Sequence, residues 1–148
     1  MNPYYKNQRV LNAGLFIVLF FCFSTVAAQQ RKQNRNIIFQ AADMEVALRL
    51  AKQQHKIIFV DAYAIWCAPC KQLKATTFRD KKVAGYFNAR FINATIDVEK
   101  ESGPNFSDQY AVDSYPTLLF INENGRLVKK REGFADAGAL LAMAESIH

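Results

Sequence analysis

The sequence predicts an α/β fold with a central mixed sheet flanked by helices. Apolar runs at residues 57–60 and 91–97 predict strands, and the stretches between them carry apolar residues at helical spacing. Such alternation favours parallel strands with helices on both faces. Near the C-terminal end, residues 117–121 and 127–132 flank Asn124-Gly125, a strong hairpin signal that adds antiparallel strands.

The predicted elements follow the order βαβα, then βα, then ββα. Residues 37–39 are expected to form the first strand, and Asp43 to cap a helix that ends near residues 54–55. The continuous apolar run at 57–60 is typical of a central strand buried on both faces. Further helices are expected over residues 69–77, 80–88, 106–110 and 135–147.

The first 28 residues have the pattern of an export signal. Lys6 and Arg9 precede an apolar run at 13–26, and small residues at 26–28 suit a signal peptidase. The run of about 14 residues is short for a helix crossing a hydrocarbon core of ~30 Å, so we expect cleavage after residue 28. An uncleaved N-terminal anchor is the alternative. Either way the protein is expected to be exported, in the periplasm or another extracytoplasmic space.

The rest of the chain is expected to form a flexible lead-in over residues 29–36 and one domain over residues 37–148. Loss of the signal lowers the formal net charge from +6 to +4, because Lys6 and Arg9 leave and no acidic residue does. The remaining charges form no basic face interleaved with aromatic residues, which argues against a nucleic acid partner. We expect a monomer.

Three cysteines are present, and their placement matters more than their number. Cys22 lies within the signal, and residues 19–21 before it lack the small side chains that lipid attachment requires. Only Cys67 and Cys70 then remain. A disulfide that closes so small a loop constrains the unfolded chain only slightly, so a structural role explains the pair poorly.

A Cys-x-x-Cys pair at the start of a helix is suited to redox chemistry. Pro69 favours the first turn of a helix, which places Cys67 at the helix N-terminus. There the helix dipole and unpaired backbone N–H groups stabilise a thiolate, the species that attacks disulfides. We expect Cys67 to be the exposed nucleophile and Cys70 the buried resolving thiol.

Roles for the pair in metal binding, haem attachment or inert packing fit the sequence less well. A structural zinc site needs four ligands, and beyond the pair the mature chain offers only His55 and His148. Covalent haem attachment needs a histidine where Lys71 stands. An inert buried pair does not account for Trp66 and Pro69 around it. No metal and no cofactor are therefore expected.

The residues around the pair resemble a known family. The segment 60–71, Val-Asp-Ala-Tyr-Ala-Ile-Trp-Cys-Ala-Pro-Cys-Lys, is similar to the active-site stretch of thioredoxins, and Ser114-Tyr115-Pro116-Thr117 resembles their cis-proline loop. Residues 70–78 also look like the thioredoxin-like C-terminal domain of transmembrane disulfide reductases. The resemblance covers residues 37–148 and implies a thioredoxin fold.

The resemblance implies a role for each catalytic position. Cys67 would attack the substrate disulfide, Cys70 would resolve the mixed disulfide, and Cys67 and Cys70 would form the redox disulfide. Asp61, in a buried strand, would lie behind the pair and exchange a proton with Cys70, since burial raises the pKa of a carboxyl. A strand-end aspartate paired with a lysine is the alternative for Asp61.

The resemblance also implies a substrate-binding surface. Trp66 would flank and shield the pair, with core packing as its alternative role. Tyr115 would contact the substrate backbone beside a cis Pro116, with a trans proline that opens a strand as the alternative. Ala68 and Pro69, between the cysteines, would complete this surface.

Four positions depart from the thioredoxin pattern. Ala68 replaces a glycine, Tyr63 replaces a tryptophan, and Asn93 stands where a lysine near the buried carboxylate is usual. A helix-kinking proline is missing around Ala75. These changes leave the chemistry intact but bear on the redox potential and on the partner surface.

The sequence therefore predicts an exported thiol–disulfide oxidoreductase that acts on protein disulfides as a reductant. A reductant outside the cytoplasm must be recharged, which suggests a membrane-bound electron donor. Two alternatives remain: a disulfide oxidant or isomerase, and a thioredoxin-fold binding or chaperone protein without redox turnover.

Overall fold

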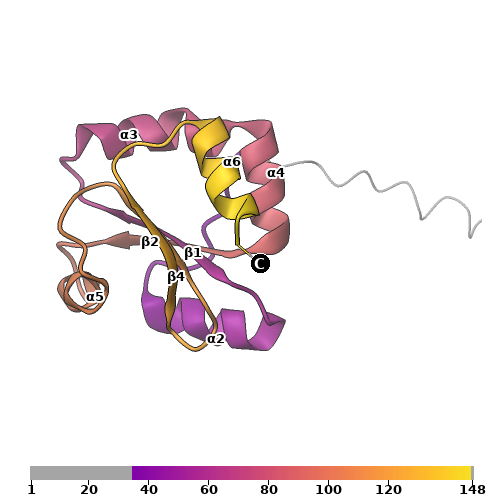
Figure 1. The fold of residues 1–148 in the computed structure, drawn as a ribbon. Helices are drawn as coiled ribbons and strands as arrows, with labels where there is room; N and C mark the ends of the chain where they lie inside the picture. The colour runs from indigo at the N-terminus through magenta and orange to yellow at the C-terminus, as the bar shows by residue number, and fades with distance from the viewer. Residues whose placement is uncertain (1–34, 148) are drawn as a thin grey trace, which may run out of the picture. The chain divides into compact units, whose positions relative to one another are not determined.

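Four strands form a mixed sheet in the computed structural model, which describes residues 35–147 (Figure 1). The strand order is β2-β1-β3-β4. The central strand β1 (Ile58–Tyr63) pairs in parallel with β2 (Ile92–Asp97) and antiparallel with β3 (Thr117–Ile121). β4 (Leu127–Glu132) forms the hairpin with β3. The predicted mixed sheet and its hairpin are confirmed.

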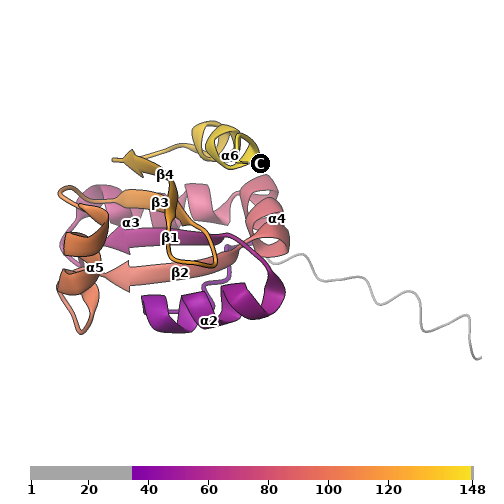
Figure 2. The same ribbon diagram turned by 60° about the horizontal axis from the view of Figure 1, so that its bottom comes forward.

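Helices cover both faces of the sheet. Figure 2 shows α2 on one face and α3, α4 and α6 on the other. The bounds are Met44–Gln54 for α2, Ala68–Ala75 for α3, Lys81–Arg90 for α4, Gly103–Tyr110 for α5 and Ala137–Glu145 for α6, with a short 3-10 helix, η3, at Thr77–Arg79. The helices on each face therefore pack an apolar layer of side chains against the sheet.

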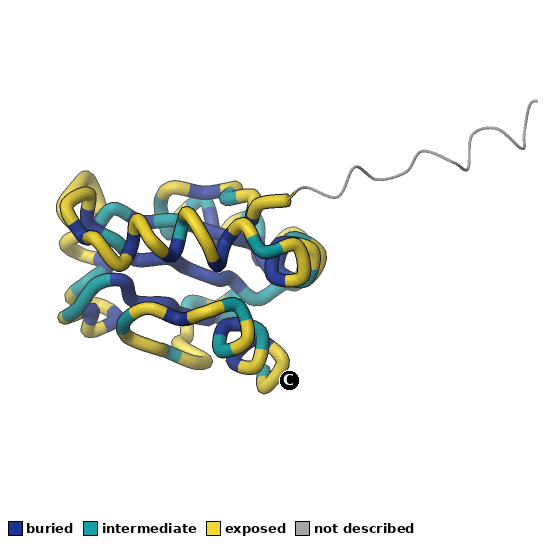
Figure 3. Tube along the Cα trace, turned by 90° about the horizontal axis from the view of Figure 1, so that it is seen from above, coloured by how far each residue is buried: buried dark blue, intermediate teal, exposed yellow. Residues whose placement is uncertain are grey.

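The core is divided by the sheet into two apolar clusters. Side chains alternate between faces along a strand, so neighbours in β1 belong to different clusters. Val60 packs with the α2 cluster, whereas Phe59 packs with the cluster under α3, α4 and α6. Figure 3 shows the consequence: the strands at the centre are mostly buried, and the outer helix faces are exposed.

Aspartate side chains begin three of the helices. Asp43 accepts a hydrogen bond from the backbone N–H of Val46 at 2.8 Å, which caps α2 where the sequence predicts. Asp80 caps α4 and Asp136 caps α6 in the same way. Each cap satisfies a backbone N–H that has no partner within its helix.

The expected strand at residues 37–39 is wrong. The N–H of Ile37 donates to the carbonyl of Phe78 at 2.9 Å, and the N–H of Ile38 donates to the side chain of Asn88 at 2.8 Å. Contact with the sheet edge consists of an isolated bridge between Ala41 and Ala94 and of hydrogen bonds between Asn93 of β2 and residues 38 and 40. This segment is therefore held by individual bonds to loops and side chains, and no continuous ladder forms.

The helix expected at residues 106–110 begins earlier, at Gly103. Glycine is required at this first position, because a Cβ on residue 103 would lie 2.1 Å from the carbonyl oxygen of Asp97. Pro104 then fits the first turn, where its missing N–H leaves no bond unmade.

The predicted export signal and residues 29–34 of the lead-in lie outside the described residues. Among residues 35–147, every helix is too short or too polar to cross a bilayer.

Replacing Phe59 by alanine should lower the free energy of unfolding by about 3–5 kcal/mol, because the ring is fully buried against three other phenylalanines. Phe134→Ala is the matched control, since Phe134 is among the exposed apolar residues. Its cost should stay below about 1 kcal/mol. Urea denaturation of both variants checks this expectation, and equal losses would contradict the described core.

Candidate active site

Cys67 and Cys70 form a disulfide at the N-terminus of α3. Cys67 is the N-cap residue, and its Sγ accepts a hydrogen bond from the N–H of Cys70 at 3.1 Å. Pro69 lies in the first turn, as its fixed φ and missing N–H favour. A thiolate on Cys67 would thus sit where backbone donors and the helix dipole stabilise negative charge.

The two cysteines are almost equally buried in this disulfide form. Cys67 is 3% exposed and Cys70 is 1% exposed. The expectation of an exposed Cys67 is therefore wrong for the oxidised state, because the sulfur that caps the helix turns inward onto its first turn. Ala68 and Pro69, between them, are exposed.

Trp66 lies on the surface beside the pair. It is 63% exposed, so the alternative of core packing is wrong. Its indole Nε1 donates a hydrogen bond to Glu99 Oε1 at 2.8 Å, and its ring meets that of Tyr115 edge-on at a centroid distance of 5.9 Å. Ile65, 55% exposed, extends the same surface. Glu99 and Ile65 were missed by the sequence reasoning, since nothing in their spacing links them to the motif.

Tyr115 and Pro116 reach the site from a distant part of the chain. The bond between them is cis, as the resemblance implied. The loop is fixed at both ends: Thr117 Oγ1 donates to the carbonyl of Ser114 at 2.6 Å, and the N–H of Gly133 donates to the carbonyl of Pro116 at 2.7 Å. The fold therefore brings both motifs to one surface.

Asp61 lies in the middle of β1 and is fully buried. Its Oδ2 is 3.6 Å from Lys74 Nζ and accepts a hydrogen bond from Thr95 Oγ1 at 3.3 Å. Its Oδ1 has no hydrogen-bond partner among the described residues. Burial raises the pKa of Asp61 to about 6, and the Lys74 ammonium and the Thr95 hydroxyl oppose that rise. The carboxyl can thus accept or release a proton near neutrality.

The structure places Lys74 beside Asp61, whereas the sequence indicates only that Asn93 stands where a lysine near the carboxylate is usual. The amide of Asn93 donates instead to the carbonyl of Ile38 and to Asn88, each at 3.2 Å. Lys74, on α3, supplies the positive charge. Lys74 follows Cys70 by four residues, a spacing that puts both on one face of a helix and could have identified it.

The position of Lys74 also bears on the alternative role for Asp61. Asp61 is paired with a lysine, as that alternative held, but it lies within β1 and not at its end. A charge pair and a proton-exchange role are compatible at this position.

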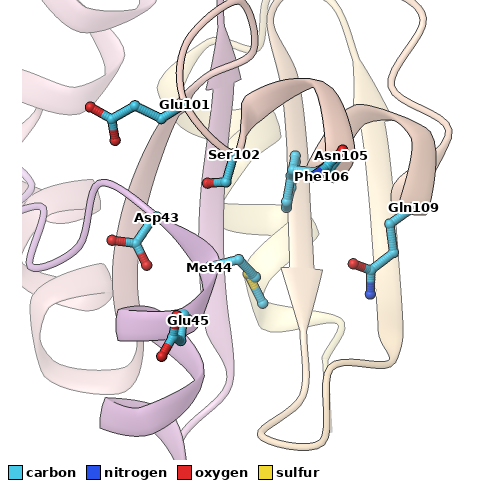
Figure 4. A pocket seen from close by; sticks show the side chains of 8 residues that line it. All are labelled: Asp43, Met44, Glu45, Glu101, Ser102, Asn105, Phe106 and Gln109. Atoms are coloured by element: carbon cyan, nitrogen blue, oxygen red, sulfur yellow. The ribbon is translucent and has the colours of Figure 1, made fainter.

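A cavity of about 300 Å³ lies away from the pair, between the start of α2 and α5 (Figure 4). Figure 4 shows Asp43 and Glu45 at the start of α2 and Glu101 ahead of α5 lining it. Neither cysteine lines this cavity. The buried cysteines lie instead beneath exposed residues, among them Trp66, Ala68 and Pro69.

Among residues 35–147, no three His, Cys, Asp or Glu side chains gather as metal ligands would. The described site thus rests on two sulfurs, one buried carboxyl with its lysine, and an exposed aromatic surface.

The relatives found by comparison with known proteins include thiol:disulfide interchange proteins and thioredoxins. Thiol:disulfide interchange protein DsbD of Pseudoalteromonas atlantica is 27% identical over 93% of this chain, and Thioredoxin-1 of Drosophila melanogaster is 34% identical over 53% of it. The match covers 25% of DsbD and 69% of Thioredoxin-1. This chain therefore corresponds to about a quarter of DsbD.

Solved structures agree with the fold. A proposed disulphide-isomerase from Bacteroides thetaiotaomicron is 41% identical, with a TM-score of 0.67 over 74% of this chain and 91% of that chain. The oxidised C-terminal domain of Neisseria meningitidis DsbD is 23% identical, with a TM-score of 0.61 over 70% of this chain and 92% of that domain, a likeness of fold. Residues 44–148 match the thioredoxin-like domain family, and the chain belongs to that family.

Proposed function

We propose that this protein is an exported thiol–disulfide oxidoreductase that reduces protein disulfides through Cys67 and Cys70. The observation that carries the proposal is the Cys67–Cys70 disulfide at the N-terminus of α3, on the same side of the sheet as the buried Asp61 carboxyl. A disulfide that closes so short a loop adds little stability, whereas this location suits a reactive thiolate.

The reaction follows from this placement. In the reduced protein, the Cys67 thiolate attacks one sulfur of a substrate disulfide, forms a mixed disulfide and releases the other substrate sulfur as a thiolate, which takes up a proton. Cys70 gives its proton to Asp61, and its thiolate attacks the Cys67 sulfur. The second substrate thiolate leaves and is protonated. Two electrons pass to the substrate, and the Cys67–Cys70 disulfide forms.

The exposed surface around the pair would hold the substrate chain. Trp66 and Tyr115 form its aromatic part, and Ala68 and Pro69 are exposed between the cysteines. Tyr115 is half-buried, and Pro116, which is buried, fixes the backbone next to it. We assign substrate binding to these five residues, and proton exchange to Asp61.

Net reduction is the direction that we favour, because a carboxyl with a pKa near neutrality can take the proton of the resolving thiol when the mixed disulfide must break. The name of the Bacteroides relative favours an isomerase as the second candidate. The same residues serve both directions, and the reduction potential decides between them.

An extracytoplasmic location is part of the proposal. Residues 1–28 would be the export signal or an uncleaved anchor, residues 29–36 a lead-in, and residues 37–148 the working domain. Likeness to DsbD supports a membrane-bound electron donor that recharges the pair, with a monomeric protein exchanging disulfides with it. Mass spectrometry of the exported protein tests cleavage after residue 28.

Cysteine substitutions test the exchange directly. Cys67→Ser should abolish reduction of a disulfide-bonded substrate such as insulin, because the attacking sulfur is gone. Cys70→Ser should accumulate a mixed disulfide, visible on a non-reducing gel, because the resolving sulfur is gone. In protein that keeps residues 1–28, Cys22→Ser removes a thiol outside the pair and should leave the rate unchanged. Reduction that survives Cys67→Ser would favour a binding or chaperone protein.

Asp61→Asn should stabilise the oxidised protein near pH 7.5. The pKa of Asp61 is raised from 3.8 to about 6, which corresponds to at most about 3 kcal/mol of unfolding free energy lost once the group is ionised. The loss develops as pH rises from about 4 through 6, so the gain in the variant should vanish below about pH 4. Urea denaturation across this range measures it. Asp113→Asn, at an exposed position, controls for charge, and a less stable Asp61→Asn at pH 7.5 would contradict the cost of the buried charge.

A further inference from the structure

The Lys74 ammonium lies between two groups of β1. Its Nζ is 3.6 Å from Asp61 Oδ2 and 3.1 Å from the centroid of the Tyr63 ring. The Lys74 side chain is 36% exposed, while that of Asp61 is fully buried. A cation at such a distance over an aromatic face is attracted by the ring, and here the same cation also faces a carboxylate.

The residue spacing within β1 and within α3 accounts for this arrangement. Asp61 and Tyr63 are two residues apart in β1, which puts them on the same face of the strand. Cys70 and Lys74 are four residues apart in α3, which puts them on the same face of the helix. The contact between Lys74 and Asp61 shows that these two faces meet. Lys74 therefore contacts the Asp61 carboxyl from a position one helical turn after the resolving cysteine.

We propose that Lys74, held in place by the Tyr63 ring, is a positioning residue that keeps the Asp61 carboxylate ionised and directed at the proton of Cys70. The inference rests on the proposed function, because it concerns the step in which Cys70 releases the substrate. It also connects two departures from the thioredoxin pattern: Tyr63 replaces the tryptophan, and Lys74 takes the place of the lysine missing at Asn93.

The other charged and polar groups near this site are few among the described residues. Thr95, on β2, donates its hydrogen bond to the oxygen of Asp61 that faces Lys74. Burial, and after it the charges of Asp97 and Asp61, raise the pKa of the Tyr63 hydroxyl. Asp97, at the end of β2, is paired with Lys100 at 3.7 Å. Tyr63 therefore stays neutral at physiological pH, and Lys74 is the cation that balances Asp61.

A cavity connects the same groups to the surface. Lys74 and Thr95, the two side chains that contact Asp61, both line a cavity of about 260 Å³, together with Phe39, Phe78 and Arg79. Asp61 itself does not line this cavity. Its two polar partners thus lie between the buried carboxyl and this cavity.

Titration of Asp61 tests the proposal in the full-length protein. The Asp61 carboxyl is followed by carbon NMR in the oxidised protein from pH 4 to 9. Lys74→Met should raise the titration midpoint by about one pH unit, because an opposite charge is lost. Lys74→Arg should keep it near the original value, and Lys71→Met, on an exposed part of the same helix, should leave it unchanged. Near-UV circular dichroism shows that each variant is folded.

The Tyr63 ring is tested by a matched pair of variants. Tyr63→Leu should raise the titration midpoint of Asp61, because the Lys74 ammonium loses the aromatic ring that holds it in place. Tyr63→Phe keeps the ring and should leave the midpoint unchanged. In the substrate-release step, the pH of half-maximal rate should move with the midpoint in each variant. An unchanged midpoint in Lys74→Met would overturn the proposal.

The two proposals fail separately. If the unaltered protein does not reduce disulfides but Lys74→Met still shifts the Asp61 midpoint, the proposed function fails and the coupling of Lys74 to Asp61 stands. If reduction proceeds and the release step keeps the same pH profile in Lys74→Met, the function stands and the positioning role is wrong.

Discussion

The buried charge of Asp61 is the constraint around which this structure is organised. A carboxylate removed from water costs several kcal/mol unless partners compensate for it, and an apolar residue would fill the same space at no such cost. The fold supplies two partners from two elements, a lysine of α3 and a threonine of β2. One oxygen stays without a hydrogen bond in the described structure. This incomplete compensation keeps the pKa near neutrality, where a proton can move in either direction.

The position of the cysteine pair follows from the same contact. α3 must lie over β1 for Lys74 to reach Asp61, and its first turn then carries Cys67 and Cys70 at the end of the sheet. Apolar packing holds the helix there, since Leu73 of α3 is fully buried in the cluster that contains Phe59. Catalytic geometry and core stability thus depend on the same helix. The exposed aromatic surface around Trp66 lies outside this core and is available to a partner.

Much of the fold could be predicted from the sequence because local signals were strong. The strands at residues 117–121 and 127–132 have the predicted bounds, since Asn124-Gly125 fixes the turn between them. The strand predicted at residues 37–39 is wrong, because an apolar run in the sequence does not reveal which groups its backbone will hydrogen-bond. Those partners are Phe78 and Asn88, far along the chain, and they hold the segment outside the ladder.

In the candidate site too, features set by local sequence could be predicted, and features set by contacts between distant segments could not. The positions of Cys67, Cys70 and Pro69 follow from local helix chemistry, and the cis bond at Pro116 agrees with the resemblance. The burial of Cys67 and the pairing of Lys74 depend on how α3 lies over β1, which no local pattern specifies. The resemblance placed the expected lysine at Asn93, on β2, whereas the positive charge beside Asp61 comes from Lys74, on α3.

The equilibrium potential of the Cys67–Cys70 pair against glutathione tests the central claim most directly. Quantifying the reduced and oxidised forms across a series of glutathione ratios at pH 7 gives this value. We predict a potential of about −270 mV, on the thioredoxin scale, as a reductant requires. A potential of about −120 mV would mark the pair as an oxidant and contradict the proposed direction of electron flow.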